Sequence, residues 1–175
     1  RYFQCAKKYS FSTIVRITAD CPLIDPQIVD KVIEQFFSGN YDFATNTLIR
    51  TFPIGTDVEV FSFSALNRAW ENTQLPSERE HVTPYLRKEE NFKIINVEND
   101  KNISNLRLTV DRIEDFELIK QILNNISINP IHLEDVLELF SRKPELIEIN
   151  KHINHNEGFN KSLEEDKEFI KKQKR

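Results

Sequence analysis

The sequence is poor in glycine and cysteine. Its 175 residues include three glycines, at positions 39, 55 and 158, and two cysteines, Cys5 and Cys21. The glycines form neither a G-x-G-x-x-G nor a Walker A motif, so neither of these phosphate-binding loops is present. The cysteines form no C-x-x-C pair and no Cys/His cluster at metal spacing, so neither a disulfide framework nor a zinc site is indicated. A reducing, cytoplasmic compartment is the default expectation.

Methionine, long apolar runs and a strong charge are also missing. The chain has no Met and opens at Arg1, so we expect a fragment or processed piece of a longer protein. No apolar run approaches a membrane span, which argues against a membrane protein. The 24 basic and 28 acidic residues give a net charge of −4 and no basic stripe for a nucleic-acid backbone. Length and hydrophobic content fit one soluble domain that acts on small molecules.

Hydrophobic periodicity predicts alternating strands and helices. The clearest helix follows Asp25, a candidate N-cap, with Pro26 at the first helical position. We expect a mostly buried strand over 13–18 and a helix over 112–126 with one apolar face. That face is Phe116, Ile119, Ile122, Leu123 and Ile126. The helix after Asp25 is predicted over 26–37. Further strands are predicted at 41–45, 57–61, 92–97 and 106–110, and further helices at 64–72, 77–88 and 132–140.

The composition changes near residue 129. We divide the chain into a main part, 1–128, and a C-terminal helical appendage of the same domain, 129–175. The appendage includes a polar tract over 150–158, interpreted as a surface loop, and a final stretch of mixed charge, predicted as a solvated helix with a frayed end.

Two carboxylates, Asp20 and Asp111, each follow a predicted strand. The carboxyl ends of parallel strands are where open α/β sheets build ligand sites, so both side chains could approach one crevice. Magnesium is held by one or two carboxylates together with substrate phosphates, so this pair suggests Mg²⁺ and nucleotide chemistry. The alternative for Asp111 is a helix cap, because Glu114 three residues later completes a capping box.

Two further segments carry polar side chains suited to a ligand. Arg79, Glu80, His81 and Thr83 lie in one short stretch whose composition suits a polyhydroxylated molecule. Asp57 and Glu59 share one face of a predicted strand and point into solvent, a partner or a pocket. Capping, i,i+4 pairing and structural hydrogen bonds remain open as alternatives for these residues.

Taken together, several segments resemble the cytidylyltransferase superfamily, most closely its spore-coat polysaccharide biosynthesis branch. They occur in the order of that family and span nearly the whole chain. The segments are Arg16–Asp25, Phe52–Phe61, Arg79–Tyr85, Arg107–Asp111 with Glu114–Phe116, and Asn156–Ser162.

The resemblance implies an α/β nucleotide-diphospho-sugar transferase fold, a three-layer Rossmann-like arrangement with a mixed, mainly parallel sheet. It implies an enzyme that joins CTP to an acidic or modified sugar, giving a CMP-sugar and pyrophosphate for surface polysaccharide synthesis. By this similarity Asp20 and Asp111 are the catalytic, Mg²⁺-binding carboxylates, and the segments containing Asp57, Glu59 and Arg79 line the sugar side. Dimerisation into a homodimer is also a family expectation.

The chain departs from this pattern in two places. It lacks the N-terminal strand and phosphate-binding loop with which family members begin, and Arg112 stands where a small or hydroxyl residue is common. Two alternatives therefore stay open. One keeps the fold but uses another nucleoside triphosphate, and the other is a truncated, non-catalytic module that binds a sugar or a partner.

Overall fold

The computed structural model describes residues 1–88, 90, 92–153 and 157–173, with side chains from 162 onward in the last segment. Part of the predicted loop over 150–158 and the predicted frayed end therefore lie outside the described residues. The elements, in chain order, are α1 (Tyr2–Tyr9), β1 (Thr13–Arg16), α2 (Pro26–Phe37), β2 (Phe43–Thr45), β3 (Glu59–Ser62), α3 (Phe63–Asn72), α4 (Pro76–His81), β4 (Ile94–Asn96), α5 (Ile113–Asn125), α6 (Leu133–Arg142), the 3-10 helix η1 (Pro144–Ile149) and α7 (Glu157–Gln173).

The four strands form one mixed sheet in the order β1-β3-β2-β4. β3 is antiparallel to both of its neighbours, and β2 is parallel to β4. β1, β2 and β4 therefore run in one direction and β3 alone runs in the other. The predicted α/β class with a mixed sheet is confirmed, although two of the three strand pairings are antiparallel.

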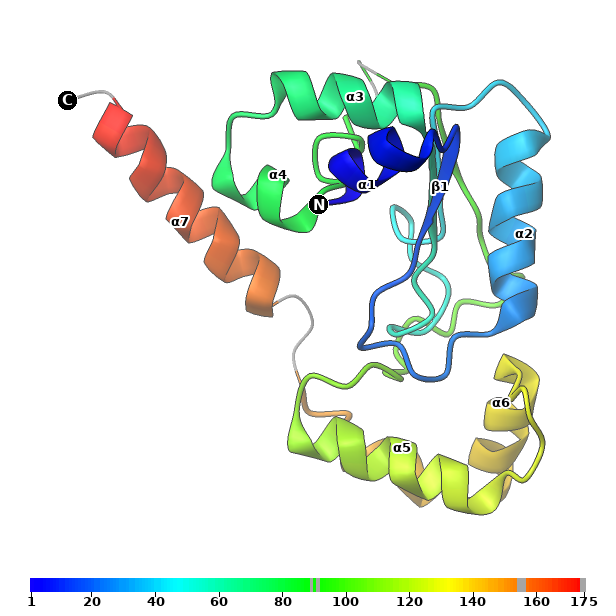
Figure 1. Cartoon of the computed structure of the whole chain (residues 1–175). Helices are drawn as coiled ribbons and strands as arrows, with labels where there is room; N and C mark the ends of the chain where they lie inside the picture. The colour runs from blue at the N-terminus through cyan, green and yellow to red at the C-terminus, as the bar shows by residue number, and fades with distance from the viewer. Residues whose placement is uncertain (89, 91, 154–156, 174–175) are drawn as a thin grey trace.

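Helices cover both faces of this sheet. Figure 1 shows α2 along one face and α1, α3 and α4 on the other side of β1. Neighbouring residues of β3 divide between the two layers, because successive side chains point to opposite faces. Val60 packs in the core that contains α2 residues, and Phe61 packs in the second core with Ala65 and Leu66 of α3. Glu59 is on the same face of β3 as Phe61.

Strand β1 is less buried than the sequence predicts. Its β-branched residues indicate a buried strand, but β1 is the edge of the sheet among the described residues. Val15 is 41% exposed, and Ile17, just beyond the strand, is 37% exposed. Composition alone does not separate an edge strand from a central one.

Helix α2 begins as predicted. The side chain of Asp25 accepts a hydrogen bond from the Gln27 backbone N–H at 2.8 Å, and Pro26 occupies the first turn. The same carboxylate accepts the backbone N–H of Leu133 at 2.8 Å and contacts Nδ1 of His132 at 3.0 Å. A single buried side chain therefore caps α2 and joins it to the start of α6.

Two predicted elements differ from the structure. The helix predicted over 77–88 ends at His81, because Val82 has φ 70° and Pro84 disfavours helical backbone at the residue before it. The strand predicted over 106–110 is an extended segment with a single bridge, Ile54 to Arg107. This segment runs alongside the loop before β3 and is not a strand of the sheet.

Helix α5 has nearly the predicted bounds, but its cap and part of its buried face differ from the prediction. Its N-cap residue is Arg112, and Asp115 takes the third helical position, so the predicted Asp111–Glu114 capping box is wrong. Phe116 is 54% exposed and Leu123 is 53% exposed, whereas Leu118 is buried. The periodicity was correct for a helix and for Ile119 and Ile122, which are buried, but not for Phe116 and Leu123.

The C-terminal third packs at two separate places. Leu133, Val136 and Leu146 join the same hydrophobic core as residues of α2, so α6 and η1 close one end of the main body. Helix α7 packs on α4, where Asp166 accepts hydrogen bonds from the backbone N–H and the hydroxyl of Ser77 at 3.1 and 2.5 Å. None of the described helices combines the length and the apolar content needed to cross a membrane.

Candidate functional site

Asp20 lies beyond the carboxyl end of β1, and the chain brings Asp111 close to it. The backbone carbonyl of Asp20 accepts a hydrogen bond from the N–H of Val110 at 2.9 Å and from the hydroxyl of Thr109 at 3.0 Å. Asp111 follows directly. Two backbone segments 89 residues apart in sequence are thus fastened together at the residues that carry the two carboxylates.

Asp111 is held by a buried arginine. Its Oδ2 accepts a hydrogen bond from Nη2 of Arg107 at 2.8 Å, and its side chain is 52% exposed. Arg107 also makes a two-pronged pair with Asp115, Nε to Oδ1 and Nη2 to Oδ2, both at 2.8 Å. Asn150 donates to Asp115 Oδ1 at 2.9 Å. Oδ1 of Asp111 keeps its lone pairs available, with no partner among the described residues.

The charges of this group are stabilised by pairing. Burial works against the charge of Asp115, but hydrogen bonds from Arg107 and Asn150 hold the pKa of its carboxyl below the ordinary value. Burial likewise opposes the charge of Arg107, and its hydrogen bonds to Asp115 and Asp111 raise the pKa of the guanidinium. One cation faces two carboxylates, so the group carries one negative charge in excess.

The loop before β3 is fitted against the segment that leads to Asp111. Gly55 has φ +93°, and a Cβ there would lie 2.4 Å from the Leu108 carbonyl carbon and the Thr109 nitrogen. Only glycine fits such a close approach with a left-handed backbone. The loop delivers Asp57, whose carboxylate pairs with Arg50 through contacts of 2.6 and 2.8 Å. Asp57 is partly exposed, and its charge is matched by one guanidinium.

The thiol of Cys21 lies close to the carboxylates of Asp20 and Asp57. Burial is the main reason why the pKa of its thiol is raised to about 11; a hydrogen bond with Thr18 works against this rise, and the charges of Asp20 and Asp57 contribute to it. The thiol lies 3.2 Å from the Thr18 hydroxyl and 3.8 Å from Oδ1 of Asp20. Cys21 is therefore a neutral buried thiol between two carboxylates, as its small apolar character suggests.

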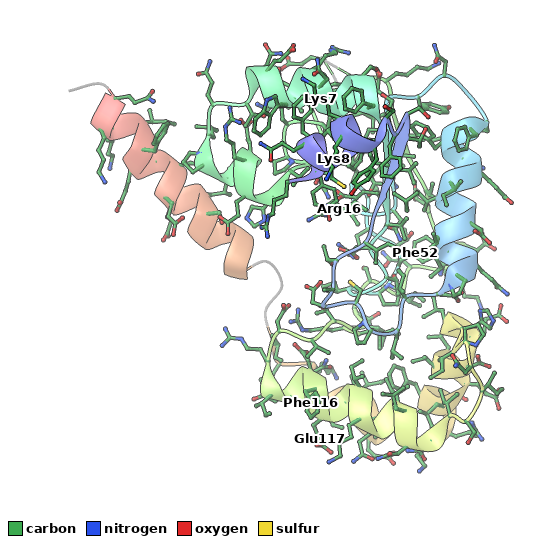
Figure 2. All side chains as sticks on the ribbon, viewed as in Figure 1. Lys7, Lys8, Arg16, Phe52, Phe116 and Glu117 are labelled. Carbon is green, nitrogen blue, oxygen red and sulfur yellow. The ribbon has the colours of Figure 1, made fainter. Side chains whose placement is uncertain are left out.

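Glu59 is the centre of a second charged cluster, on the face of the sheet away from α2. The sequence pattern leaves solvent, a partner or a pocket open for this side chain, and the structure excludes solvent, because Glu59 is 2% exposed. Its Oε2 accepts from Arg16 Nη1 at 2.6 Å, and its Oε1 accepts from Arg87 Nη2 at 2.7 Å and from the Thr83 hydroxyl at 2.8 Å. Figure 2 shows Arg16 on the side of β1 away from α2.

The remaining predicted residues lie on α4 and have other neighbours. Arg79 stacks over the ring of Trp70 at 4.9 Å and donates to the carbonyl of Thr73 at 3.0 Å. It borders a pocket of about 50 Å³ between α1, α3 and α4. His81 contacts the Ser162 hydroxyl of α7 at 2.9 Å, and Glu80 is exposed. Of the predicted 79–83 segment, the structure brings only Thr83 into direct contact with Glu59.

The arginines of these clusters are functional candidates that sequence reasoning missed. Arg16, Arg50, Arg87 and Arg107 each pair with a buried or partly buried carboxylate. For Arg107 a sequence pattern existed, because Asp111 and Asp115 follow at spacings of four and eight. For Arg16 and Arg87 none did, since their partner Glu59 is 43 and 28 residues away.

The donor set at Asp20 and Asp111 fits a hard cation. Both side chains offer carboxylate oxygens at the protein surface, the ligand type that Mg²⁺ takes. Over the described part of the chain no group of three or more His, Cys, Asp or Glu is suited to hold a metal. An ion bound here would complete its shell with water or substrate oxygens, which is the usual arrangement for magnesium.

Comparison with known proteins gives three similar chains. The chain is 32% identical to an uncharacterized protein of Methanocaldococcus jannaschii, over 87% of this chain and 63% of that protein. It is 27% identical to spore coat polysaccharide biosynthesis protein SpsF of Bacillus subtilis, over 83% of this chain and 61% of that protein. The fold matches the solved structure of a cytidylyltransferase from Leptospira borgpetersenii, with a TM-score of 0.82 and 37% identity over 88% of this chain and 66% of that one.

The profile of the cytidylyltransferase family matches residues 1–169. This agrees with the fold, with the structural neighbour and with the resemblance inferred from the sequence segments. The chain spans less than two thirds of the two similar sequences. It belongs to the cytidylyltransferase family.

Proposed function

We propose that the protein transfers a cytidylyl group from CTP to a sugar and releases pyrophosphate. The observation that carries the proposal is the hydrogen bonding of the Asp20 carbonyl to Thr109 and Val110, which holds two partly exposed carboxylates beyond the end of β1. Membership of the cytidylyltransferase family supports the nucleotide. Similarity to a spore coat polysaccharide biosynthesis protein supports a sugar acceptor, which we take to be acidic or otherwise modified.

In this proposal Asp20 and Asp111 hold Mg²⁺. When bound, the ion would neutralise part of the triphosphate charge. Asp111 keeps Oδ1 available while Arg107 fixes Oδ2, so the carboxylate is oriented before any ligand arrives. Asp115 and Asn150 in turn fix Arg107 and its backbone carbonyl. A preoriented carboxylate pays less reorganisation when charge develops during reaction.

The chain's own residues would act by positioning and not by covalent catalysis. The sugar hydroxyl oxygen forms a bond to the α-phosphorus and loses its proton to water, and the bond to the β-phosphate oxygen breaks as pyrophosphate leaves. No protein nucleophile is needed, and Cys21 is unsuited to be one because its thiol is protonated at neutral pH. Catalysis of this kind comes from orientation and electrostatic stabilisation.

The test is metal-dependent nucleotide binding and turnover. Asp20→Asn and Asp111→Asn should each abolish Mg²⁺-dependent CTP binding and pyrophosphate release. Asp100→Asn, at an exposed loop position, is the matched control and should leave both unchanged. Manganese as a paramagnetic probe should broaden NMR signals of residues beside Asp20 and Asp111 first.

The same measurements separate the alternatives. Equal binding of several nucleoside triphosphates would mean that the enzyme is not specific for CTP as the donor. No metal-dependent nucleotide binding in the wild type, with both Asn variants unchanged from it, would overturn the proposed reaction.

A further inference from the structure

The cluster around Glu59 has more positive than negative charge. Two guanidiniums, of Arg16 and Arg87, meet the single Glu59 carboxylate, whose side chain is 3% exposed. The Arg16 side chain is 19% exposed and that of Arg87 is 34% exposed. The excess positive charge is therefore carried by groups that a ligand in solution can reach.

The cluster also has hydrogen-bond donors to spare. An arginine offers five N–H donors, and Glu59 takes one bond from each. Arg87 Nη2 also reaches the hydroxyl of Thr47 at 2.9 Å. Nε of Arg16 is buried and has no hydrogen-bond partner among the described residues. Buried donors are almost always paired, so the hydrogen-bonding capacity of Arg16 is not used up within the cluster.

The cluster lies at one end of a row of charges that changes sign from β1 to the segments beyond its carboxyl end. Glu59 and its two arginines are net positive, Asp57 with Arg50 is neutral, and Asp20 with the Arg107 group is negative. Three residues lie between Arg16 and Asp20, so their Cα atoms are at most about 14 Å apart along an extended chain. One elongated substrate can therefore contact both ends, with a cation at the negative end and an anionic group at the positive end.

We propose that Arg16 and Arg87 form a binding site for an oxyanion of the substrate, the carboxylate of an acidic sugar or a phosphate of the nucleotide. Planar guanidinium groups suit both, because their donors match the oxygen spacing of carboxylate and phosphate. The inference rests on the proposed function in assigning this oxyanion to the sugar or nucleotide. The site itself needs neither metal nor transfer chemistry.

The first experiment follows the arginine Nε–Hε NMR signals of the full chain, without nucleotide or metal. Glucuronate, glucose and pyrophosphate are added in turn. Glucuronate should shift the signals of Arg16 and Arg87, and glucose, its neutral counterpart, should not. A response to pyrophosphate alone would support the oxyanion site and assign it to the nucleotide phosphates.

Two variants and one control then separate binding from folding. Arg87→Gln leaves the Arg16–Glu59 pair intact and should weaken binding of the responding anion by about tenfold, as expected for one lost charge-assisted hydrogen bond. Glu59→Gln keeps an oxygen for Thr83 and removes the negative charge, so it should tighten binding. Arg142→Gln removes an exposed guanidinium on α6 and is the control for net charge.

If the ion-pair cluster were purely structural, Arg87→Gln and Glu59→Gln would not have opposite effects on anion binding. Circular dichroism verifies that each variant is folded. The proposal is overturned if neither anion shifts Arg16 or Arg87, or if Arg87→Gln and Arg142→Gln weaken binding equally. Because no Mg²⁺ or CTP is present, failure here leaves the transfer reaction standing, and failure of metal-dependent CTP binding leaves this site standing.

Discussion

Arg107 and Glu59 are buried charges of opposite sign, and each is held by two partners. Arg107 lies between Asp115, which is fully buried, and Asp111, which is 52% exposed. Glu59 lies between Arg16, 19% exposed, and Arg87, 34% exposed. In both clusters the more buried partner neutralises the central charge and the more exposed partner carries the excess.

This difference in exposure indicates which partner of each cluster a ligand can reach. Removing the buried partner leaves a charge without compensation in a low dielectric, which is costly. Recruiting the exposed partner to a ligand leaves the buried pair intact. Each cluster thus combines a fixed structural pair with one charge that is available for binding, negative at Asp111 and positive at Arg87.

The largest effect is expected when the buried pair of the Arg107 cluster is broken. Asp115→Ala leaves Arg107 buried with only a half-exposed partner and should lower the free energy of unfolding by about 3–5 kcal/mol. Asp111→Ala removes the exposed partner and should cost less than about 1 kcal/mol. Urea denaturation measures both, and equal losses would contradict the division of roles.

Removing the charge of Glu59 should lower the free energy of unfolding less than breaking the Arg107–Asp115 pair. Glu59→Gln leaves two arginines without a counter-charge, but both reach solvent, so we expect a loss of about 2 kcal/mol, as for hydrogen bonds to a charged group. Adding the anion that shifts the Arg16 signal should restore part of the stability of this variant. Thermal unfolding with and without the anion measures it, and an anion that stabilises wild type and variant equally would argue against a specific site.

The ion pair between His132 and Asp25 differs from these two clusters in its response to pH, because guanidinium groups keep their charge at neutral pH and an imidazole does not. The hydrogen bond to Asp25 raises the pKa of His132 above its ordinary value of 6.5, and the charges of Asp135 and Glu134 add to this. A raised pKa in the folded state means that the pair stabilises the fold fully below about pH 6.5. That stabilisation is lost as the pH rises through the raised pKa.

The measurement is the difference in melting temperature between wild type and His132→Gln. We expect it to be largest near pH 5.5 and to shrink steadily toward about pH 8.5. Arg107, whose pKa is raised, should contribute no slope in this window. A difference that is constant with pH would remove His132 as the titrating group.

The smallest effect concerns the negative end of the charge row. Asp20 contributes to the raised pKa of Cys21, so Asp20→Asn should lower that pKa and speed alkylation of the thiol, by less than about tenfold. Cys5 is exposed and provides the internal reference rate in the same protein. An unchanged ratio of the two rates would show that Asp20 exerts no measurable field at Cys21.

The sequence was sufficient where the determining contacts are local. The N-cap at Asp25 and the helix after it were predicted to the residue, because a cap, a proline and an apolar stripe lie within one short segment. The end of α4 at His81 was also available in principle, since Pro84 is three residues beyond it. The location of Asp20 and Asp111 at the ends of extended segments followed from the same kind of local pattern.

The sequence was insufficient where a residue's role depends on distant partners. The sequence leaves Glu59 facing solvent, a partner or a pocket, and only the positions of Arg16 and Arg87 beside it decide between them. Phe116 looks like a core residue, but the buried face of α5 is set by its packing against η1 and α6, which no periodicity specifies. Whether Asp20, Asp111 and the 79–83 segment bind metal and sugar stays a prediction for experiment.

The hydrogen bonds between Ser77 and Asp166 have a consequence for how the chain is made. The first turn of α4 receives its capping carboxylate from a residue 89 positions later. During synthesis the ribosome releases α4 long before Asp166 exists, and domains fold progressively from the N-terminus. We therefore expect α4, and with it the turn that presents Thr83 and Arg87 to Glu59, to settle only after translation has passed α7. The anion-binding end of the sheet would then mature later than the end that packs on α2.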